Sequence, residues 1–299
     1  MKKQILFIVN PIAGDIKKAN LPNLIREHLD HKQYSYEIAY TKQAGNATHL
    51  AKEAVNNKVD IVVAVGGDGS INEIARAIVN TDLCLAIIPL GSGNGLAYHL
   101  DLPIKNIKKA LEIINTGKPI HIDTLKTNKG DVVSFAGIGL EALAARTYRH
   151  LGLRGFLAYT IATVKSIFFQ YTPQVYQYNV DGQAHAKEIY LFTIYNARYL
   201  GYKVGKVEQA SLADGYMDLI VIQSFPMWKV LWIAILELIG KMYLAKECTI
   251  YRAKSLKIVL DKKSAIQLDG DSNITSSDFE IEVNPLSLKV LVSPNLNNY

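Results

Sequence analysis

The chain has 299 residues, of which 49% are hydrophobic and 20% are charged, so it can form one large or two ordinary domains with a core of normal size. Its net charge of +6 fits anionic partners such as nucleotides or an anionic membrane surface. The sequence contains no run of five like charges and no basic patch interleaved with aromatic residues, so we expect no nucleic-acid partner.

Cys84 and Cys248 are the only cysteines, and they lie far apart in the sequence. They form no metal-binding spacing with each other or with the seven histidines, so we expect no structural zinc site. Two lone cysteines are typical of a reducing compartment, which predicts a cytoplasmic protein. The apolar run at 5–9 is stopped by Asn10-Pro11 and predicts a buried strand, and no apolar run is long enough to cross a bilayer.

Strand and helix patterns alternate over the first 120 residues. We expect strands at 5–9, 34–41, 61–65 and 85–89, and helices at 16–29, 47–56, 71–79, from 95 onward and at 104–115. The strand at 61–65 is apolar at nearly every position, which is typical of a strand with both faces buried. The alternation predicts an α/β domain with a mainly parallel sheet that is covered by helices on both faces.

After about residue 123 the pattern becomes rich in strands. We expect strands at 132–136, 175–180, 188–196, 217–222, 249–260, 265–268, 279–283 and 288–292, and helices at 140–150, 156–169 and 227–246. Asp181-Gly182, between two alternating runs, indicates a hairpin turn. We therefore predict an α/β domain at 1–122 and a β-rich domain at 123–284, with a last strand in 285–299 that returns to the first domain.

In three places a predicted strand ends in a glycine-containing turn that leads into a helix. The turns lie in FIVNPIAGD (7–15), VAVGGDGSINE (63–73) and IIPLGSGNGLA (87–97). In a parallel sheet all three turns lie at the carboxyl edge, where open α/β sheets bind ligands. Glycine lets backbone N–H groups approach a phosphate closely, and a helix N-terminus adds partial positive charge. The spacing Ser70-x-x-Glu73 also predicts a capping box at the start of the second helix.

Any one of these turns is equally well explained as a plain connector, but the two glycine clusters together favour a phosphate site. Neither cluster has the GxxxxGK[ST] pattern of the P-loop. Neither matches GxGxxG with an acidic residue at the right distance, which argues against a dinucleotide dehydrogenase.

The motifs NPIAG (10–14), GGDGSINE (66–73) and PLGSGNGLA (89–97) resemble the diacylglycerol kinase catalytic family, which includes bacterial lipid kinases and sphingosine kinases. Downstream, SLADGYMDL (211–219) and LDGD (268–271) resemble that family's DG and DGE segments, so the resemblance spans nearly the whole chain. It implies an α/β nucleotide domain, a β-rich lipid domain and an active site in the cleft between them. The implied activity is transfer of the γ-phosphate of ATP to a lipid hydroxyl.

The resemblance also assigns roles to particular residues. The residues that it assigns to ATP are Asn10, Thr41, Gly66, Gly67, Asp68, Gly69, Ser70, Asn72, Gly91, Ser92, Gly93 and Asn94. Bacterial members bind Mg²⁺ at the DG segment, which here implies Asp214 with backbone oxygens of Ser211 and Tyr216. The glutamate that is proposed as proton acceptor in the family corresponds to Asp271.

Phosphoryl transfer needs positioning, charge neutralisation and a group that accepts the hydroxyl proton. We expect Asp68 to contact the metal or act as the general base, with Asp271 as the rival base. A simpler interpretation exists for each: Asp68 as a turn aspartate bonded to its own backbone, and LDGDSN as an ordinary hairpin turn.

The sequence departs from the family pattern in three places. Gly95 stands where diacylglycerol kinases usually have aspartate, Asp271 is shorter than the usual glutamate, and YLGYKVGKVEQA (199–210) replaces a glycine-rich stretch. These departures bear on the identity of the lipid and on the metal site. The lipid hydroxyl stays open between diacylglycerol, a sphingoid base and related lipids.

Two segments are candidates for lipid contact. The apolar segment 227–245 is explained either as a membrane-docking or acyl-chain helix or, more simply, as a buried helix. The basic segment 146–159 fits anionic headgroups or a solvated surface equally well. We expect transient peripheral membrane contact, and a homodimer is among the assemblies that the sequence allows.

Two alternatives to a lipid kinase remain at this stage. NAD kinases and phosphofructokinases share the GGDG turn but resemble the first domain only. A non-catalytic nucleotide- or lipid-binding regulator would be consistent with the changes at Gly95 and Asp271.

Overall fold

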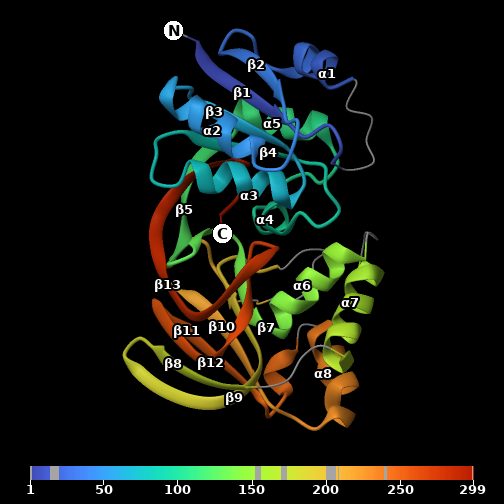
Figure 1. The fold of residues 1–299 in the computed structure, drawn as a ribbon. Coiled ribbons are helices and arrows are strands. Elements are labelled where there is room, and N and C mark those ends of the chain that lie inside the picture. Colours follow the sequence, from blue (N-terminus) through green and yellow to red (C-terminus); the bar gives the residue numbers. More distant parts are fainter. Residues whose placement is uncertain are drawn as a thin grey trace. The chain divides into compact units, whose positions relative to one another are not determined.

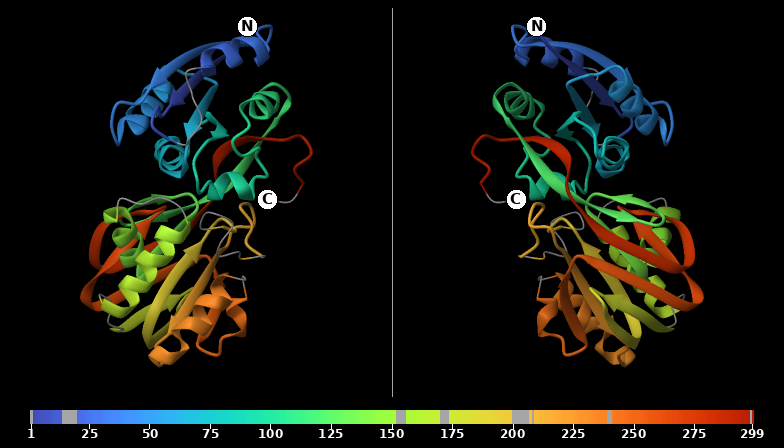
Figure 2. Two further views of the ribbon diagram at one scale, coloured as in Figure 1. Left: turned by 90° about the vertical axis from the view of Figure 1, so that its right-hand side faces the viewer. Right: turned by 90° about the vertical axis from the view of Figure 1, so that its left-hand side faces the viewer.

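The computed structural model describes residues 2–13, 20–151, 156–169, 174–199, 207, 209–238, 241–297 and 299 (Figure 1). The chain divides into two compact units. The first unit is formed by Met1–Thr124 and Pro285–Tyr299, and the second by Leu125–Asn284. The chain passes from one unit to the other within β5 (Lys118–Thr127) and again within β13 (Asp271–Val292), the long red strand in Figures 1 and 2.

The first unit opens with the predicted alternation of strands and helices. In chain order the elements are β1 (Lys3–Val9), α1 (Leu21–His28), β2 (Tyr34–Tyr40), α2 (Asn46–Asn56), β3 (Ile61–Gly66), α3 (Asp68–Ala77), β4 (Cys84–Pro89), α4 (Gly95–His99) and α5 (Ile107–Thr116). β1 pairs in parallel with β2 and β3, and β3 pairs in parallel with β4. Val290 of β13 extends this pairing, in parallel, beside Leu85 of β4.

Helices cover both faces of these parallel strands. α1 and α5 contact each other and share a buried cluster with Phe7, Val63 and Ile88 of the strands. α2 and α3 contact each other and pack against β1, β3 and β4. β3 and β4 are buried at every position, because they lie at the centre between the two helical layers.

Three helix starts in the first unit differ from the prediction. α1 begins at Leu21 with Pro22 in its first turn, where the missing N–H costs no hydrogen bond; the predicted residues 16–19 lie outside the described residues. α5 begins after Asn106, whose side chain accepts a hydrogen bond from the Lys109 N–H. α3 begins at Asp68, three residues before the predicted start at 71, because Gly67 is its N-cap.

The second unit is rich in strands, as predicted. Its further elements are β6 (Gly130–Val132), β7 (Phe135–Gly139), α6 (Leu140–His150), α7 (Phe156–Phe169), β8 (Gln174–Val180), β9 (Gln183–Tyr195), β10 (Met217–Gln223), the 3-10 turn η2 (Met227–Lys229), α8 (Val230–Leu238), the 3-10 turn η3 (Met242–Leu244), β11 (Cys248–Ala253) and β12 (Ser255–Leu268). Its strand pairs run antiparallel, so the pairing of the whole chain is mixed.

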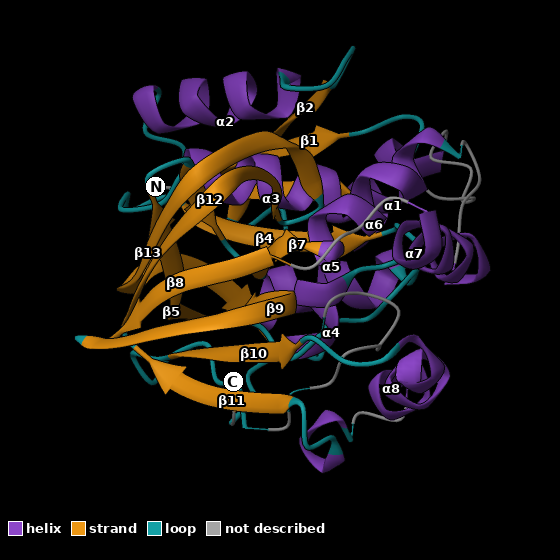
Figure 3. Cartoon of the chain, turned by 60° about the horizontal axis from the view of Figure 1, so that its bottom comes forward, coloured by secondary structure: helices purple, strands orange, loops and turns teal. Residues whose placement is uncertain are grey.

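A large apolar core lies between the strands of the second unit, with Tyr176, Phe192 and Phe279 among its largest buried side chains. α6 packs on β7, β9 and β12, and α7 packs on α6. Figure 3 shows these helices to one side of the strands.

Several elements of the second unit have different lengths from those predicted. The single helix expected at 227–246 is replaced by η2, α8 and η3; Lys241 has a non-helical backbone (φ −114°, ψ 35°), and residues 239–240 lie outside the described residues. The strand expected at 249–260 is divided between β11 and β12, whereas those at 279–283 and 288–292 are parts of one strand, β13. The hairpin turn at Asp181-Gly182 is confirmed, since Val180 pairs with Gln183 and both turn residues have positive φ (47° and 90°).

Candidate functional site

The carboxyl ends of the parallel strands are held together by backbone hydrogen bonds. The Thr41 N–H donates to the Val9 carbonyl at 2.9 Å. The Asn10 N–H donates to the Val65 carbonyl at 3.0 Å. Leu90 N–H donates to the Gly66 carbonyl at 2.7 Å, just before the second glycine cluster. The segments that the sequence assigned to ATP after β1, β2, β3 and β4 therefore meet at one edge of the first unit.

The two glycine-rich turns touch each other through their backbones. A Cβ atom built on Gly91 would lie 2.5 Å from the Gly67 Cα, and one built on Gly93 would lie 2.5 Å from Oδ2 of Asp68. Real Cβ atoms do not come this close to other atoms, so glycine is required at position 91, where the neighbour is backbone. A Cβ atom at position 93 would instead displace the Asp68 carboxylate. Gly69 is different, because a Cβ atom at this position would have no neighbour within 4 Å.

Asp68 links the two turns through its carboxylate. Its Oδ2 accepts a hydrogen bond from the Asn94 N–H at 2.6 Å, and its Oδ1 accepts one from the Gly95 N–H at 2.7 Å. Asn94 is buried with a left-handed backbone (φ 55°), and its Nδ2 donates to the Gly91 carbonyl at 2.7 Å. The carboxylate therefore orders the loop that precedes α4.

Ser70 and Asn72 are buried on the first turn of α3. The Ser70 hydroxyl accepts a hydrogen bond from Nδ2 of Asn10 at 3.1 Å, which joins the loop after β1 to α3. The predicted capping box is wrong. Ser70 lies inside the helix, the N-cap Gly67 has no side-chain hydrogen bond, and Glu73 instead accepts from the Gly45 N–H at 3.1 and 3.2 Å.

These contacts give the edge the properties of a phosphate site. Gly69 and Ser92 are exposed, one on each glycine-rich turn. Gly69 lies in the first turn of α3, a helix of 10 residues whose N-terminus carries partial positive charge. The chain thus places glycine-rich backbone, N–H donors and a helix N-terminus at the same edge.

In the second unit, the DG turn holds its carboxylate beside cationic side chains. Oδ1 of Asp214 accepts from the Tyr216 N–H at 3.0 Å, and Oδ2 accepts from the Arg252 guanidinium at 2.5 Å. Arg252 and Lys254 also lie over the Tyr216 ring, at 4.7 and 5.1 Å from its centroid. Ser211 caps the start of the turn, where its Oγ accepts from the Ala213 N–H at 3.3 Å.

The predicted ligands for Mg²⁺ offer only oxygen atoms, which is the donor type that this ion prefers. However, Arg252 already places a positive charge on the one carboxylate of the turn. No group of three His, Cys, Asp or Glu side chains that could hold a metal occurs in the described part of the chain. A divalent cation bound by Ser211, Asp214 and Tyr216 would have to displace the Arg252 guanidinium from Asp214, and this metal site stays a prediction.

Asp271 and Asp269 flank the tight turn between β12 and β13 and have different environments. The buried Asp269 carboxylate accepts hydrogen bonds from the N–H groups of Val133, Ser134 and Phe135 at 2.7 to 3.1 Å. Asp271 is half exposed, and its Oδ1 lies 3.4 Å from the Arg149 guanidinium. Asp269 therefore fixes the hairpin, and Asp271 is presented at its surface.

Two of these residues, Asp269 and Arg252, are not among the predicted site residues. Asp269 has a signal in the sequence, because aspartate before glycine is common in tight turns. Glu73 has a different partner from the one that the predicted capping box required. Arg252 stands in an ordinary alternating strand, and nothing in the sequence connects it with Asp214.

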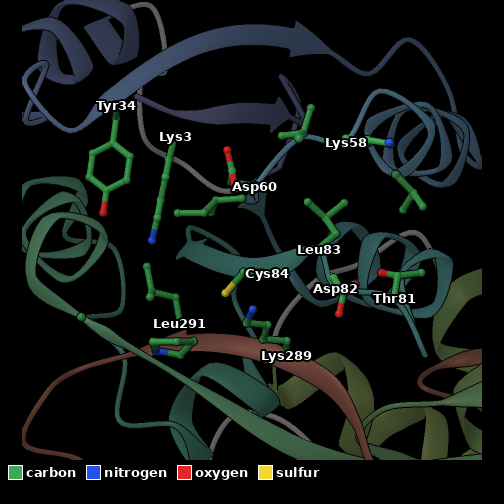
Figure 4. Close-up of a pocket in the computed structure, with 15 residues that line it drawn as sticks. Lys3, Tyr34, Lys58, Asp60, Thr81, Asp82, Leu83, Cys84, Lys289 and Leu291 are labelled. Atoms are coloured by element: carbon green, nitrogen blue, oxygen red, sulfur yellow. The ribbon is translucent and has the colours of Figure 1, made fainter. Parts of the chain in front are cut away.

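The first unit also contains a pocket of about 730 Å³ at the opposite edge of its sheet (Figure 4). Lys3, Tyr34, Ile61 and Cys84 line it at the amino ends of the parallel strands. Burial raises the pKa of the Cys84 thiol to about 11, although the nearby Lys289 and Lys3 oppose the shift. None of the residues predicted to bind ATP lines this pocket.

Comparisons with known proteins match both parts of the chain. Residues 4–127 match the diacylglycerol kinase catalytic domain. Residues 131–292 match the YegS C-terminal NAD kinase beta sandwich-like domain.

Relatives match over most of their length. A diacylglycerol kinase of Bacillus subtilis (strain 168) is 28% identical over 90% of each chain, and one of Staphylococcus carnosus (strain TM300) is 26% identical over 91% of this chain and 89% of that one. A crystal structure of a diacylglycerol kinase from Bacillus anthracis str. Sterne has the same fold, with a TM-score of 0.73 at 22% identity over 99% of this chain and 98% of that one. The chain therefore belongs to the diacylglycerol kinase family of lipid kinases, with a YegS-type C-terminal domain.

Proposed function

We propose that this lipid kinase transfers the γ-phosphate of ATP to the hydroxyl group of diacylglycerol or a closely related lipid. The observation that carries the proposal is the joining of the GGDG and GSGNG turns by Asp68 at the carboxyl edge of the parallel strands. The names of the Bacillus subtilis and Staphylococcus carnosus relatives support diacylglycerol as the acceptor.

The first unit would bind ATP. We assign the phosphates to the backbone N–H groups of the two glycine-rich turns and to the N-terminus of α3. Asn10 and Thr41 would border the nucleotide, because their backbone N–H groups fix the ends of β1 and β2 at the same edge. When bound, Mg²⁺ would accompany the ATP phosphates and neutralise charge that develops during transfer. No step is assigned to a metal at the DG turn, where Arg252 holds Asp214.

The two acidic candidates receive different roles. Both carboxylate oxygens of Asp68 accept backbone hydrogen bonds, so we assign it to positioning of the phosphate-binding turns. The hydrogen bonds that Asp271 accepts within the described residues fall on Oδ1, which leaves Oδ2 as the atom that would take the proton of the lipid hydroxyl. Arg149 would orient this carboxylate.

Partners and location follow from the lipid substrate. We propose a cytoplasmic protein that contacts a membrane transiently and acts in phospholipid metabolism. No helix among the residues described has both the length and the apolar character required to cross a bilayer. A homodimer is a further proposal, which analytical ultracentrifugation would test.

The first experiment would measure transfer of labelled γ-phosphate from Mg-ATP to a total lipid extract, followed by identification of the labelled lipid by mass. ATP affinity would be measured separately by equilibrium dialysis. We expect a labelled phosphatidate-type product. Asp68→Asn should weaken ATP binding at least about tenfold, because an amide N–H₂ would face a backbone N–H.

Asp271→Asn should lower kcat by about 10²-fold or more while ATP affinity stays within about twofold. If Asp271→Asn turned over normally, the assignment of Asp271 as the acceptor of the lipid hydroxyl proton would be wrong. Absence of any labelled lipid from an ATP-binding protein would overturn the lipid acceptor, and assays with NAD and fructose 6-phosphate would then follow.

A further inference from the structure

The helix α8 has apolar residues on an outer face as well as an inner one. Ile233 and Leu236 are buried against Ile220 and Ile222 of β10. Trp232 and Ile235 of α8 are exposed, and Trp228 in η2 lies one turn earlier with 77% of its surface exposed. The segment 227–245 is therefore only partly buried, and both tryptophans of the chain are exposed on it.

The neighbouring helix α7 repeats this arrangement. Ala158, Ala162 and Ser166 are buried, whereas Val164 and Phe168 are exposed. Ile167 of α7 packs on the same apolar cluster that holds Ile233 and Leu236 of α8, so both helices cover one part of the second unit.

Figures 1 and 3 show both helices on the same side of the strands of this unit. We call their exposed apolar residues, with those of η2 and η3, the α7–α8 face. Its members are Ile161, Val164, Phe168, Phe169, Trp228, Trp232, Ile235, Tyr243 and Leu244.

Among the side chains that the structure describes, the charges around the α7–α8 face are mainly positive; the side chain of Glu237 on α8 is outside this set. Lys165, Lys241 and Lys246 are exposed within or beside it. α7 contains no acidic residue, and Glu247 is paired with Lys229. An apolar surface with exposed cations at its border is complementary to an anionic lipid surface, in which acyl chains lie below negative headgroups.

We infer that the α7–α8 face docks on an anionic lipid bilayer and lies in its interface. The inference rests on the proposed function, because a lipid acceptor must be taken from a membrane. Trp and Tyr side chains prefer the membrane interface, where the ring is in an apolar layer and its polar atom stays hydrated.

The chain carries its own probe for this interaction. Trp228 and Trp232 are its only tryptophans, so all tryptophan fluorescence reports on the α7–α8 face. Vesicles of phosphatidylcholine with phosphatidylglycerol should shift the emission to shorter wavelength, and brominated acyl chains should quench it. Unchanged emission and no quenching at saturating lipid would overturn the inference.

A variant that keeps both tryptophans tests which residues bind. Phe168→Ser with Ile235→Ser should weaken vesicle binding at least about tenfold, because two apolar side chains no longer leave water. The matched control is Val175→Ser with Val259→Ser, on β8 and β12, whose valines are also exposed. The control should bind vesicles as the unchanged protein does, and equal weakening by both pairs would contradict the assignment to this face.

Activity measurements separate this inference from the proposed function. The Phe168→Ser, Ile235→Ser variant should lose activity toward diacylglycerol in vesicles but keep activity toward a short-chain diacylglycerol dissolved as monomers. Vesicle binding without activity on either substrate would reject the proposed function and retain the docking surface. If sedimentation shows a dimer that this variant dissociates, and fluorescence is unaffected by lipid, the face binds a second copy and the inference is wrong.

Discussion

At the scale of single residues, the candidate site depends on Asp68 and on the small size of two glycines. The carboxylate of Asp68 accepts hydrogen bonds from Asn94 and Gly95, which belong to the other turn. Such charge-assisted bonds are short and strong, and they fix a loop that has no regular structure of its own. An acidic residue at a phosphate site would repel its ligand, but here its negative charge is directed at backbone N–H groups.

The glycines of the two turns should differ sharply in their tolerance of a methyl group. Gly91→Ala should lower the thermal unfolding midpoint by several degrees, since its Cβ would be forced against the Gly67 Cα. Gly69→Ala should keep or slightly raise the midpoint, because its Cβ meets open space and alanine favours the helix α3. Calorimetry of the nucleotide-free proteins measures both values. Equal midpoints for the two variants would show that the turns do not touch.

At the scale of elements, the hairpin between β12 and β13 separates a structural carboxylate from an exposed one. Asp269 has a left-handed backbone (φ 49°) and binds three consecutive N–H groups before and at the start of β7. Asp271 begins β13 and pairs with Arg149 on α6. The hairpin is therefore anchored on one side while the other side stays available to a ligand.

This division predicts that two substitutions differ strongly in their effect on stability. Asp269→Ala should lower the free energy of unfolding by about 3 kcal/mol or more, because two buried N–H groups and one partly buried N–H group lose their acceptor. Asp271→Asn should change it by less than about 0.5 kcal/mol, since the side chain is half exposed and its ion pair is screened by solvent. Urea unfolding monitored by far-UV circular dichroism provides the comparison. A larger loss for Asp271→Asn than for Asp269→Ala would invalidate the assignment.

At the scale of the whole molecule, the net charge of +6 favours anionic surfaces, and the α7–α8 face adds an apolar contribution. These two contributions respond differently to salt. Electrostatic attraction is screened as the Debye length falls from about 30 Å at 0.01 M to about 3 Å at 1 M ionic strength, whereas apolar burial is not weakened in this way.

Binding to vesicles that contain phosphatidylglycerol should therefore fall as salt is raised but should not disappear. The residual binding at high salt should match that to vesicles of phosphatidylcholine alone. Flotation of the protein with both kinds of vesicle at low and high salt measures this. Complete loss of binding at high salt would indicate that only charge, and not the apolar face, holds the protein on lipid.

Several features were determined by the sequence itself. The order of strands and helices in the first unit follows from apolar periodicity, and the glycine clusters at 66–69 and 91–95 identify the turns that carry the candidate site. The Asp181-Gly182 hairpin is local as well, because positive φ at two adjacent residues is a property of those residues. Such features need no information about distant parts of the chain.

Only the tertiary structure decided which groups meet. Asp68 binds Asn94 and Gly95, Glu73 binds Gly45, and Arg252 binds Asp214, although each pair is more than 25 residues apart in the sequence. Strand pairing brings these partners together. The apolar periodicity of the sequence contains no information about which strands pair. The same holds for α8, whose sequence is apolar at every position except Glu237. Packing in the cluster that contains Ile220 and Ile222 of β10 decided which of its residues are buried and left Trp232 exposed.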